Sequence, residues 1–200
     1  MDELAAILHR EAGASAMILT GPYPGYALAA NAVISQVFQT VPDAQWCVAG
    51  GDDTEPDPEW HPEHIALQLE GHFAGTFGVM QPTGDRWANG SIDNIAGSPW
   101  VGREWARRAH AGTGALCKEF FHMCVDEALL FAAEKEGVYL RRPDLTHRHN
   151  HFCRLGEHVD WSQPMPAHLV RANSEFEWTK ARAAMQLFRL EYDSKWKPIP

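Results

Sequence analysis

The sequence WCVAGGDDTEPDP, residues 46–58, is the part of the chain that decides the fold class. It starts with a short apolar run that stops at Gly50 and Gly51, and two adjacent carboxylates, Asp52 and Asp53, follow. An apolar run of this length, bounded by turn residues, is typical of a buried strand. Ligands of open α/β sheets bind at the edge where the strands end. We therefore expect Asp52 and Asp53 at a ligand-binding edge.

The two carboxylates repel each other unless a cation lies between them. Hard divalent ions such as Mg²⁺ or Mn²⁺ bridge carboxylate and phosphate oxygens, and they suit such a site. An acidic turn exposed to solvent is the alternative. Residues 46–58 alone favour neither interpretation.

Length and composition favour one globular domain over residues 1–200. The net charge of −9 disfavours tight, non-specific binding to nucleic acid. The four cysteines have no C-x-x-C spacing, which disfavours a disulfide framework or a zinc knuckle. The first residues do not have the basic and apolar pattern of a secretory signal peptide, so we expect none. No apolar run is long enough to cross a bilayer. We expect a reduced, cytoplasmic protein, in the host cytoplasm if a phage encodes it, and the oligomeric state stays open.

Apolar periodicity predicts strands that alternate with helices. Helices are expected at residues 2–12, 27–41, 61–70, 124–136 and 174–192, and strands at 16–19, 46–49, 76–80 and 138–140. Ser174 and Glu177 have the spacing of a capping box at the start of the last helix. Residues 97–99 form a turn that leads Trp100 and Arg103 into a helix or a loop. This alternation predicts an α/β domain with a largely parallel sheet.

Three histidines alternate directly after the strand expected at 138–140. His147, His149 and His151 would point to one side of an extended chain, which is a good arrangement for metal ligands. A surface run or a pH-sensitive loop are the alternatives, and we favour contact with a metal or a substrate for at least one histidine. A carboxylate and a histidine from a distant strand would complete a divalent-ion site.

Two further groups of residues have the chemistry of a transfer reaction. Asp126 and Glu127 open a helix, where a carboxylate is either a partner of the helix dipole or a general base for an acceptor hydroxyl. The guanidinium of Arg86 suits binding of a phosphate or a carboxylate, and the ring of Trp87 suits stacking on a sugar or a base. An ion pair between Asp85 and Arg86 beside a buried tryptophan is the alternative for the second group.

Taken together, these motifs resemble the glycosyltransferase family 2 type of the GT-A fold, particularly its small phage and bacterial members. The resemblance covers about residues 16–152 and rests on the order of four motifs. They are the helix start Ala29-Ala30-Asn31, the acidic Gly51-Asp52-Asp53, the pair Asp126-Glu127 after a G-S-P-W segment, and the histidine of LTHRHNH. It implies a three-layer α/β/α sandwich with a mostly parallel central sheet, and residues 153–200 would add a loop and a helix.

The resemblance also implies a role for each motif. Asp53 would bind Mn²⁺ or Mg²⁺, with His147 as the second protein ligand and His149 or His151 as alternates. The nucleotide-sugar, with a UDP-sugar as the first expectation, would contact a set of five residues: Thr20, Gly21, Asn31, Asp52 and Arg86. The acceptor side would include four others: Trp87, Ser98, Trp100 and Arg103. Asp126 or Glu127 would be the base of an inverting transfer.

The sequence departs from the family pattern at three places. Gly51 replaces the first acid of the usual D-x-D motif, and the acidic pair reads D-E where many members read E-D. The family's first strand precedes its first helix, whereas this chain begins at that helix, so residues 16–20 are the expected substitute.

The sequence therefore predicts a metal-dependent glycosyltransferase that acts on a glycan, a protein, a small molecule or a modified base of phage DNA. A divalent-metal phosphohydrolase or nucleotidyltransferase would use the same Asp and His residues and is one alternative. A non-catalytic remnant that binds a nucleotide or a sugar is the other.

Overall fold

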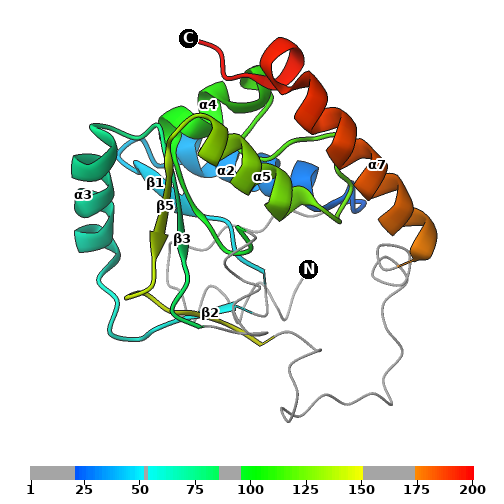
Figure 1. The fold of residues 1–200 in the computed structure, drawn as a ribbon. Coiled ribbons are helices and arrows are strands. Elements are labelled where there is room, and N and C mark those ends of the chain that lie inside the picture. Colours follow the sequence, from blue (N-terminus) through cyan, green and yellow to red (C-terminus); the bar gives the residue numbers. More distant parts are fainter. Residues whose placement is uncertain (1–20, 52–53, 86–95, 151–173) are drawn as a thin grey trace, which may run out of the picture.

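A four-stranded sheet lies at the centre of the computed structural model, which describes residues 21–51, 54–85, 96–150 and 174–200 (Figure 1). The strands of this sheet are β1 (Trp46–Val48), β3 (Val79–Pro82), β4 (Trp100–Gly102) and β5 (Tyr139–Arg142), and their order is β1-β4-β3-β5. Two further strands, β2 (Thr54–Pro56) and β6 (His147–His149), pair with each other as an antiparallel ribbon. The α/β class predicted from the sequence is confirmed.

The sheet is small and mixed, so the prediction of a mostly parallel sheet is wrong for the described strands. β4 pairs antiparallel with β1 on one side and with β3 on the other, and only β3 and β5 pair in parallel. The chain enters β4 at the edge of the sheet where β1, β3 and β5 end. β4 therefore runs in the direction opposite to these three strands. Because β4 is reversed relative to both neighbours, β1, β3 and β5 all run in the same direction.

The strand predicted at residues 46–49 is confirmed as β1, although it is not a buried strand. Among the described strands β1 pairs only with β4, so it forms an edge of the sheet. Trp46 is buried, whereas the side chain of Val48 is exposed. The pattern of apolar residues therefore predicts the strand correctly but not its place in the sheet.

Five helices are described: α2 (Tyr26–Thr40), α3 (Pro62–Phe73), α4 (Arg103–Gly112), α5 (Val125–Lys135) and α7 (Glu175–Glu191), the last continued by a π-helical turn, η3 (Tyr192–Trp196). The helices predicted at 27–41, 61–70, 124–136 and 174–192 are confirmed, and the hydroxyl of Ser174 accepts the expected hydrogen bond from the N–H of Glu177. The helix predicted at 2–12 and the strand at 16–19 lie outside the described residues. None of the described helices has the length and apolar character needed to span a membrane.

Helices cover both faces of the sheet (Figure 1). On one face α3 buries Ile65 and Leu69 against Met80 and Trp100 of the sheet. On the other face α2, α4, α5 and α7 form the larger core. The small side chains of α5, such as Ala128 and Ala132, are fully buried in this core, and their size lets the helix approach the strands closely.

Candidate functional site

The sheet brings the ends of three strands to one edge. β1, β3 and β5 run in the same direction, so the segments that follow Val48, Pro82 and Arg142 leave the sheet at this edge. The chain enters β4 there as well, through Ser98 and Pro99, and the carbonyl of Pro99 accepts a hydrogen bond from Ala49 N–H at 2.9 Å. This is the edge at which α/β sheets bind their ligands.

The residues that flank the acidic pair are hydrogen-bonded to each other. The carbonyl of Gly51 accepts hydrogen bonds from the hydroxyl of Thr54 at 2.8 Å and from its N–H at 3.3 Å. A side chain at Gly50 would lie 2.7 Å from the same hydroxyl, so Thr54 would have to shift to admit one. Asp52 and Asp53, between these flanks, lie outside the described residues. The described flanks of the acidic pair, Gly51 and Thr54, are thus held close to each other.

The strand that follows the acidic pair contacts the strand that carries the histidines. In the β2–β6 ribbon Thr54 is opposite His149, and Pro56 is opposite His147. Figure 1 shows this ribbon beside the ends of β3 and β5. The strand that follows the acidic pair and the strand of His147 and His149 are therefore neighbours, while a metal site made by the carboxylates and the histidines stays a prediction.

His147 is a buried imidazole, 6% exposed, with one face stacked on Trp60 at a centroid distance of 5.1 Å. Burial lowers the pKa of His147, and hydrogen bonding with the backbone of Ser98 raises it by a smaller amount. Its Nδ1 is buried and has no hydrogen-bond partner among the described residues. A neutral imidazole with an unpaired nitrogen is the form that binds metal ions.

The predicted alternation of the histidine strand is confirmed for two of its three histidines. Along β6, His147 is buried, Arg148 is exposed and His149 is half-buried, so the two histidines share the inner side. His151 lies outside the described residues.

The segment after β3 makes three hydrogen bonds, one to the end of β5, one to the turn that follows it and one to β6, the histidine strand. Thr83 N–H donates to the carbonyl of Arg142 at 3.0 Å, and Gly84 N–H donates to that of Leu145 at 2.9 Å. The carboxylate of Asp85 then accepts a hydrogen bond from the N–H of His149 at 3.1 Å. Arg86 and Trp87 lie outside the described residues, so both their expected ligand contacts and the alternative ion pair between Asp85 and Arg86 stay predictions.

Asp126 lies at the start of α5, close to the same edge. Its backbone carbonyl accepts a hydrogen bond from Ala96 N–H at 3.4 Å, and its carboxylate accepts one from Glu127 N–H at 3.1 Å. The pKa of Asp126 is raised to about 6, chiefly by burial and next by the charge of Glu127. Hydrogen bonds from the backbone N–H groups of Glu127 and Asp126, and to a smaller extent the nearby His149, act in the opposite direction. A carboxyl that titrates this close to neutrality suits a general base.

Glu127 faces a different part of the molecule. It lines a groove between α5 and α7 with Cys124, Arg182 and Arg189 among its neighbours, and its Oε2 is buried without a hydrogen-bond partner. Burial, together with a hydrogen bond to Glu127, raises the pKa of the Cys124 thiol to about 12. Adjacent residues of a helix point about 100° apart, and so only one of the two carboxylates is directed to the strand ends.

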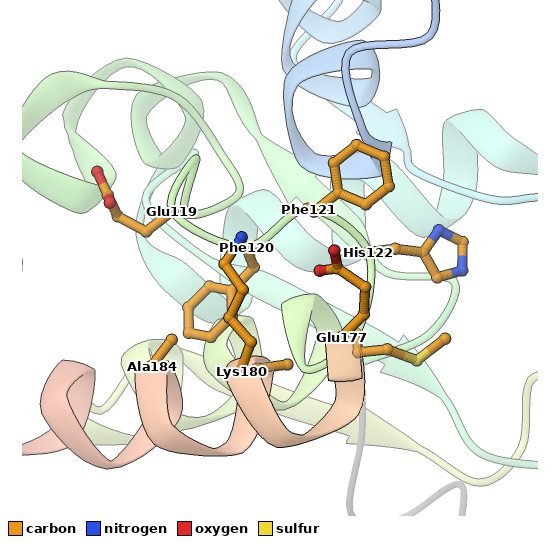
Figure 2. Close-up of a pocket in the computed structure, with 9 residues that line it drawn as sticks. Glu119, Phe120, Phe121, His122, Glu177, Lys180 and Ala184 are labelled. Carbon is orange, nitrogen blue, oxygen red and sulfur yellow. The ribbon is translucent and has the colours of Figure 1, made fainter. Parts of the chain in front are cut away.

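A second hollow lies between residues 119–123 and the start of α7, as Figure 2 shows. Glu119, His122, Glu177 and Lys180 are its polar lining residues. It contains none of the site residues expected from the sequence.

Two residues expected on the acceptor side have structural roles instead. The guanidinium of Arg103 donates to the carbonyls of Phe38, Val41, Pro42 and Ala44, so it binds the end of α2. Trp100 is 5% exposed and packs in the core beneath α3. We therefore remove both from the acceptor side, because neither side chain is available to a ligand.

Three other expected site residues can be placed. Asn31 donates its amide to the carbonyl of Leu116 at 2.8 Å and accepts the Leu116 N–H at 2.9 Å, so both halves of its amide bind the backbone rather than a nucleotide. Ser98 is buried at the edge described above, and Gly21 is an exposed bend residue. Thr20 lies outside the described residues.

The described residues alone contain no group of three His, Cys, Asp or Glu side chains that would hold a metal ion. His147 and His149 are the ligands that this part of the chain offers, and Asp53 would have to supply the carboxylate. No family model matches the sequence, and comparison with curated proteins and with solved structures found no match.

The close approach of Gly84 to the histidine strand leads to a prediction. A side chain there would lie 2.7 Å from the carbonyl oxygen of Leu145 and 2.6 Å from the hydroxyl of Thr146. We expect Gly84→Ala to lower the free energy of unfolding by about 1–3 kcal/mol and to speed amide exchange at His149, because the two segments must separate. Urea denaturation and hydrogen exchange measure the two effects.

Gly71→Ala is the matched control. Gly71 is exposed within α3 and a side chain there meets nothing within 4 Å, so this change should stabilise the protein by about 0.5–1 kcal/mol. Equal stability of the two variants would show that β3 and the histidine strand do not approach each other in this way.

Proposed function

We propose that the protein is a metal-dependent glycosyltransferase with a GT-A-like fold, which moves a sugar from a nucleotide-sugar to an acceptor hydroxyl with inversion. One observation carries the proposal: the β2–β6 pairing brings the strand after Asp52 and Asp53 against His147 and His149. Helices on both faces of the sheet and three strands of common direction are consistent with the fold. A UDP-sugar is the first donor to test.

The residues present fit a divalent ion. The buried Nδ1 of His147 has no hydrogen-bond partner among the described residues, so this nitrogen is open to a ligand. Carboxylates, which Asp53 would supply, are the ligands that Mn²⁺ and Mg²⁺ prefer. Asp53 and His147 would hold the ion, with His149 and His151 as alternates, and Asp52 would lie next to the ribose or the metal ligands. When bound, such an ion offsets the charge of the diphosphate and makes it a better leaving group.

Asp126 is the base in this proposal. Its carboxylate takes the proton of the acceptor hydroxyl while that oxygen forms its bond to the anomeric carbon. The bond from the anomeric carbon to the diphosphate oxygen breaks on the opposite face, and the configuration inverts. With a pKa of about 6, most of the carboxyl is ionised at pH 7 and still basic enough to accept the proton.

The acceptor is a hydroxyl compound that reaches Asp126. A glycan, a protein, a small molecule and a modified base of phage DNA all carry such a hydroxyl, and the net charge of −9 disfavours the DNA acceptor. Ser98 is the acceptor-side residue that lies at this edge, and its N–H is already donated to the amide of Gln81 at 3.1 Å.

The donor site predicts metal-dependent binding of a nucleotide. We expect UDP or a UDP-sugar, from a panel that includes the GDP compounds, to raise the thermal midpoint only with Mn²⁺ present, because the diphosphate and Asp53 share the ion. A ligand at 100 times its dissociation constant adds about 2.7 kcal/mol to stability. Asp53→Ala should abolish the shift.

No shift with any nucleotide would contradict the donor site. Release of sugar or phosphate at full rate without an acceptor would instead indicate a divalent-metal hydrolase.

The different surroundings of the two carboxylates predict different effects on transfer. Asp126→Asn should lower the rate of nucleoside diphosphate release in the presence of an acceptor mixture by about 10²–10⁴-fold and leave donor binding nearly intact. In the wild type this rate should rise with pH through about 6, because the base must be ionised. Glu127→Gln is the control, and a larger loss in that variant than in Asp126→Asn would assign the base to Glu127 instead.

A further inference from the structure

The turn that ends α4 has a strained backbone. His110 and Ala111 adopt left-handed backbone angles, with φ of 49° and 56°, a region that only glycine adopts routinely. Gly112 follows, with a positive φ of its own, and the carbonyl of His110 accepts hydrogen bonds from the N–H and the hydroxyl of Thr113 at 3.3 and 2.8 Å. Backbone strain persists only where the surrounding structure holds it, and it is frequent in switch regions.

The side chain of His110 helps to hold this turn in place. Its imidazole is 1% exposed and contacts two aromatic rings, those of Trp105 on α4 and Phe188 on α7, at centroid distances of 6.1 and 5.9 Å. Neither ring nitrogen has a hydrogen-bond partner among the described residues. The carbonyl of Ala115 accepts the indole N–H of Trp105 at 3.1 Å. This environment tolerates a neutral imidazole but not a charged one.

The elements around the ring do not compensate a positive charge there. Burial lowers the pKa of His110 to about 4, and of the described groups only the backbone of Ala115 acts against it. Cys117 and Tyr192, in the same core as Trp105 and Phe188, are neutral near neutral pH because burial raises the pKa of both. Charged side chains of α4, α7 and η3 are engaged elsewhere: with each other (Arg107–Glu104, Lys135–Asp193, Lys195–Glu191), over other rings (Arg108, Arg182, Arg189) or in the hollow of Figure 2 (Glu177, Lys180).

The same turn binds the C-terminal end of the chain, which Figure 1 shows beside α4. The N–H of Ile199 donates to the carbonyl of Arg108 at 3.0 Å, and the guanidinium of Arg108 donates to the carbonyl of Ile199 at 2.6 Å. Phe188, which contacts the His110 ring, also contacts Trp196 of η3 at a centroid distance of 6.0 Å. A movement of the His110 ring therefore reaches residues 196–199 through the backbone and through the core.

We propose that residues 109–113 form an acid-sensitive latch, which holds the C-terminal end of the chain on α4 while the His110 ring is neutral and opens when the ring takes up a proton. The proton binds a ring nitrogen, and the imidazolium leaves the core because water supplies the hydrogen bonds that the core lacks. Residues 110 and 111 then relax from the left-handed region, and Ile199 separates from Arg108. The latch does not depend on the proposed function.

Amide hydrogen exchange of the full chain at several pH values, corrected for the intrinsic exchange rate at each pH, tests the latch. A histidine with a pKa of about 4 in the closed latch and an ordinary value of 6.5 in the open one makes the opening constant rise roughly tenfold per pH unit between these values. We expect this rise, about 100-fold over the interval, at the amides of Thr113 and Ile199. The amide of Val79, which donates to the Val138 carbonyl at 2.9 Å beside the sheet, should keep its protection.

Two variants separate the His110 ring from other titrating groups. His110→Phe keeps an aromatic ring in the core but takes up no proton, so opening at Thr113 and Ile199 should not change with pH in this interval. His72→Gln removes an exposed histidine of α3 and is the matched control, which should behave as the wild type. His110→Gln gives the same test if His110→Phe does not fold.

Opening at Thr113 and Ile199 that is independent of pH in the wild type would overturn the inference. An equal dependence on pH in the wild type and in His110→Phe or His110→Gln would also overturn it. The same holds for an equal loss of protection at Val79, because the whole protein would then unfold in acid rather than the latch alone.

Discussion

The pairing of β4 with both β1 and β3 is the constraint on which the rest of the structure depends. Val101, at its centre, is fully buried and lies opposite both Cys47 and Val79. Because β4 is antiparallel to both neighbours, β1 and β3 run in the same direction as β5 and end at a common edge. Without β4, the acidic loop after β1 would have no fixed relation to the segments after β3 and β5.

The residues on either side of Val101 extend this constraint to the helices. Trp100 fills the core under α3, and Arg103 binds four carbonyls at the end of α2. Gly102 lies so close to the backbone of Thr76 that a side chain would collide with it. Residues 100–103 thus join the sheet, α2, α3 and the start of α4. The side chains of Trp100 and Arg103 are used in these contacts, and for this reason they stabilise the fold rather than bind a ligand.

Periodicity predicts the long elements well, because a helix of eleven or more residues repeats its apolar face several times. β1, β4 and β6 have three residues each, too few to show a period. β1 is still predicted, because glycines bound its apolar run, whereas β4 is not predicted as a strand and the alternating histidines indicate only an extended chain at β6. The expected roles of Asn31, Trp100 and Arg103 fail for a related reason. Residue type indicates what a side chain can bind, whereas the partner depends on segments up to 85 residues away, such as Leu116 for Asn31.

In the candidate site, too, the residue types indicate the chemistry, whereas the tertiary structure decides which residues come together. The order of acidic motif, acidic pair and histidines suggests a divalent-ion site, but only the β2–β6 register pairs Thr54 with His149. The sequence leaves Asp126 and Glu127 equivalent, whereas the structure turns Glu127 to the groove beside α7 and raises the pKa of Asp126 by burial.

The central claim is that a divalent ion binds between the acidic loop and the histidine strand. Electron spin echo spectroscopy of the protein with Mn²⁺ tests it directly, since a coordinated imidazole couples its nitrogen to the metal. We predict a histidine nitrogen coupling in the wild type that disappears in His147→Gln and remains in His64→Gln, a change on α3. Absence of bound Mn²⁺, or bound Mn²⁺ without any histidine coupling, would contradict the site as described, whereas a coupling that persists in His147→Gln would assign the ligand to His149 or His151.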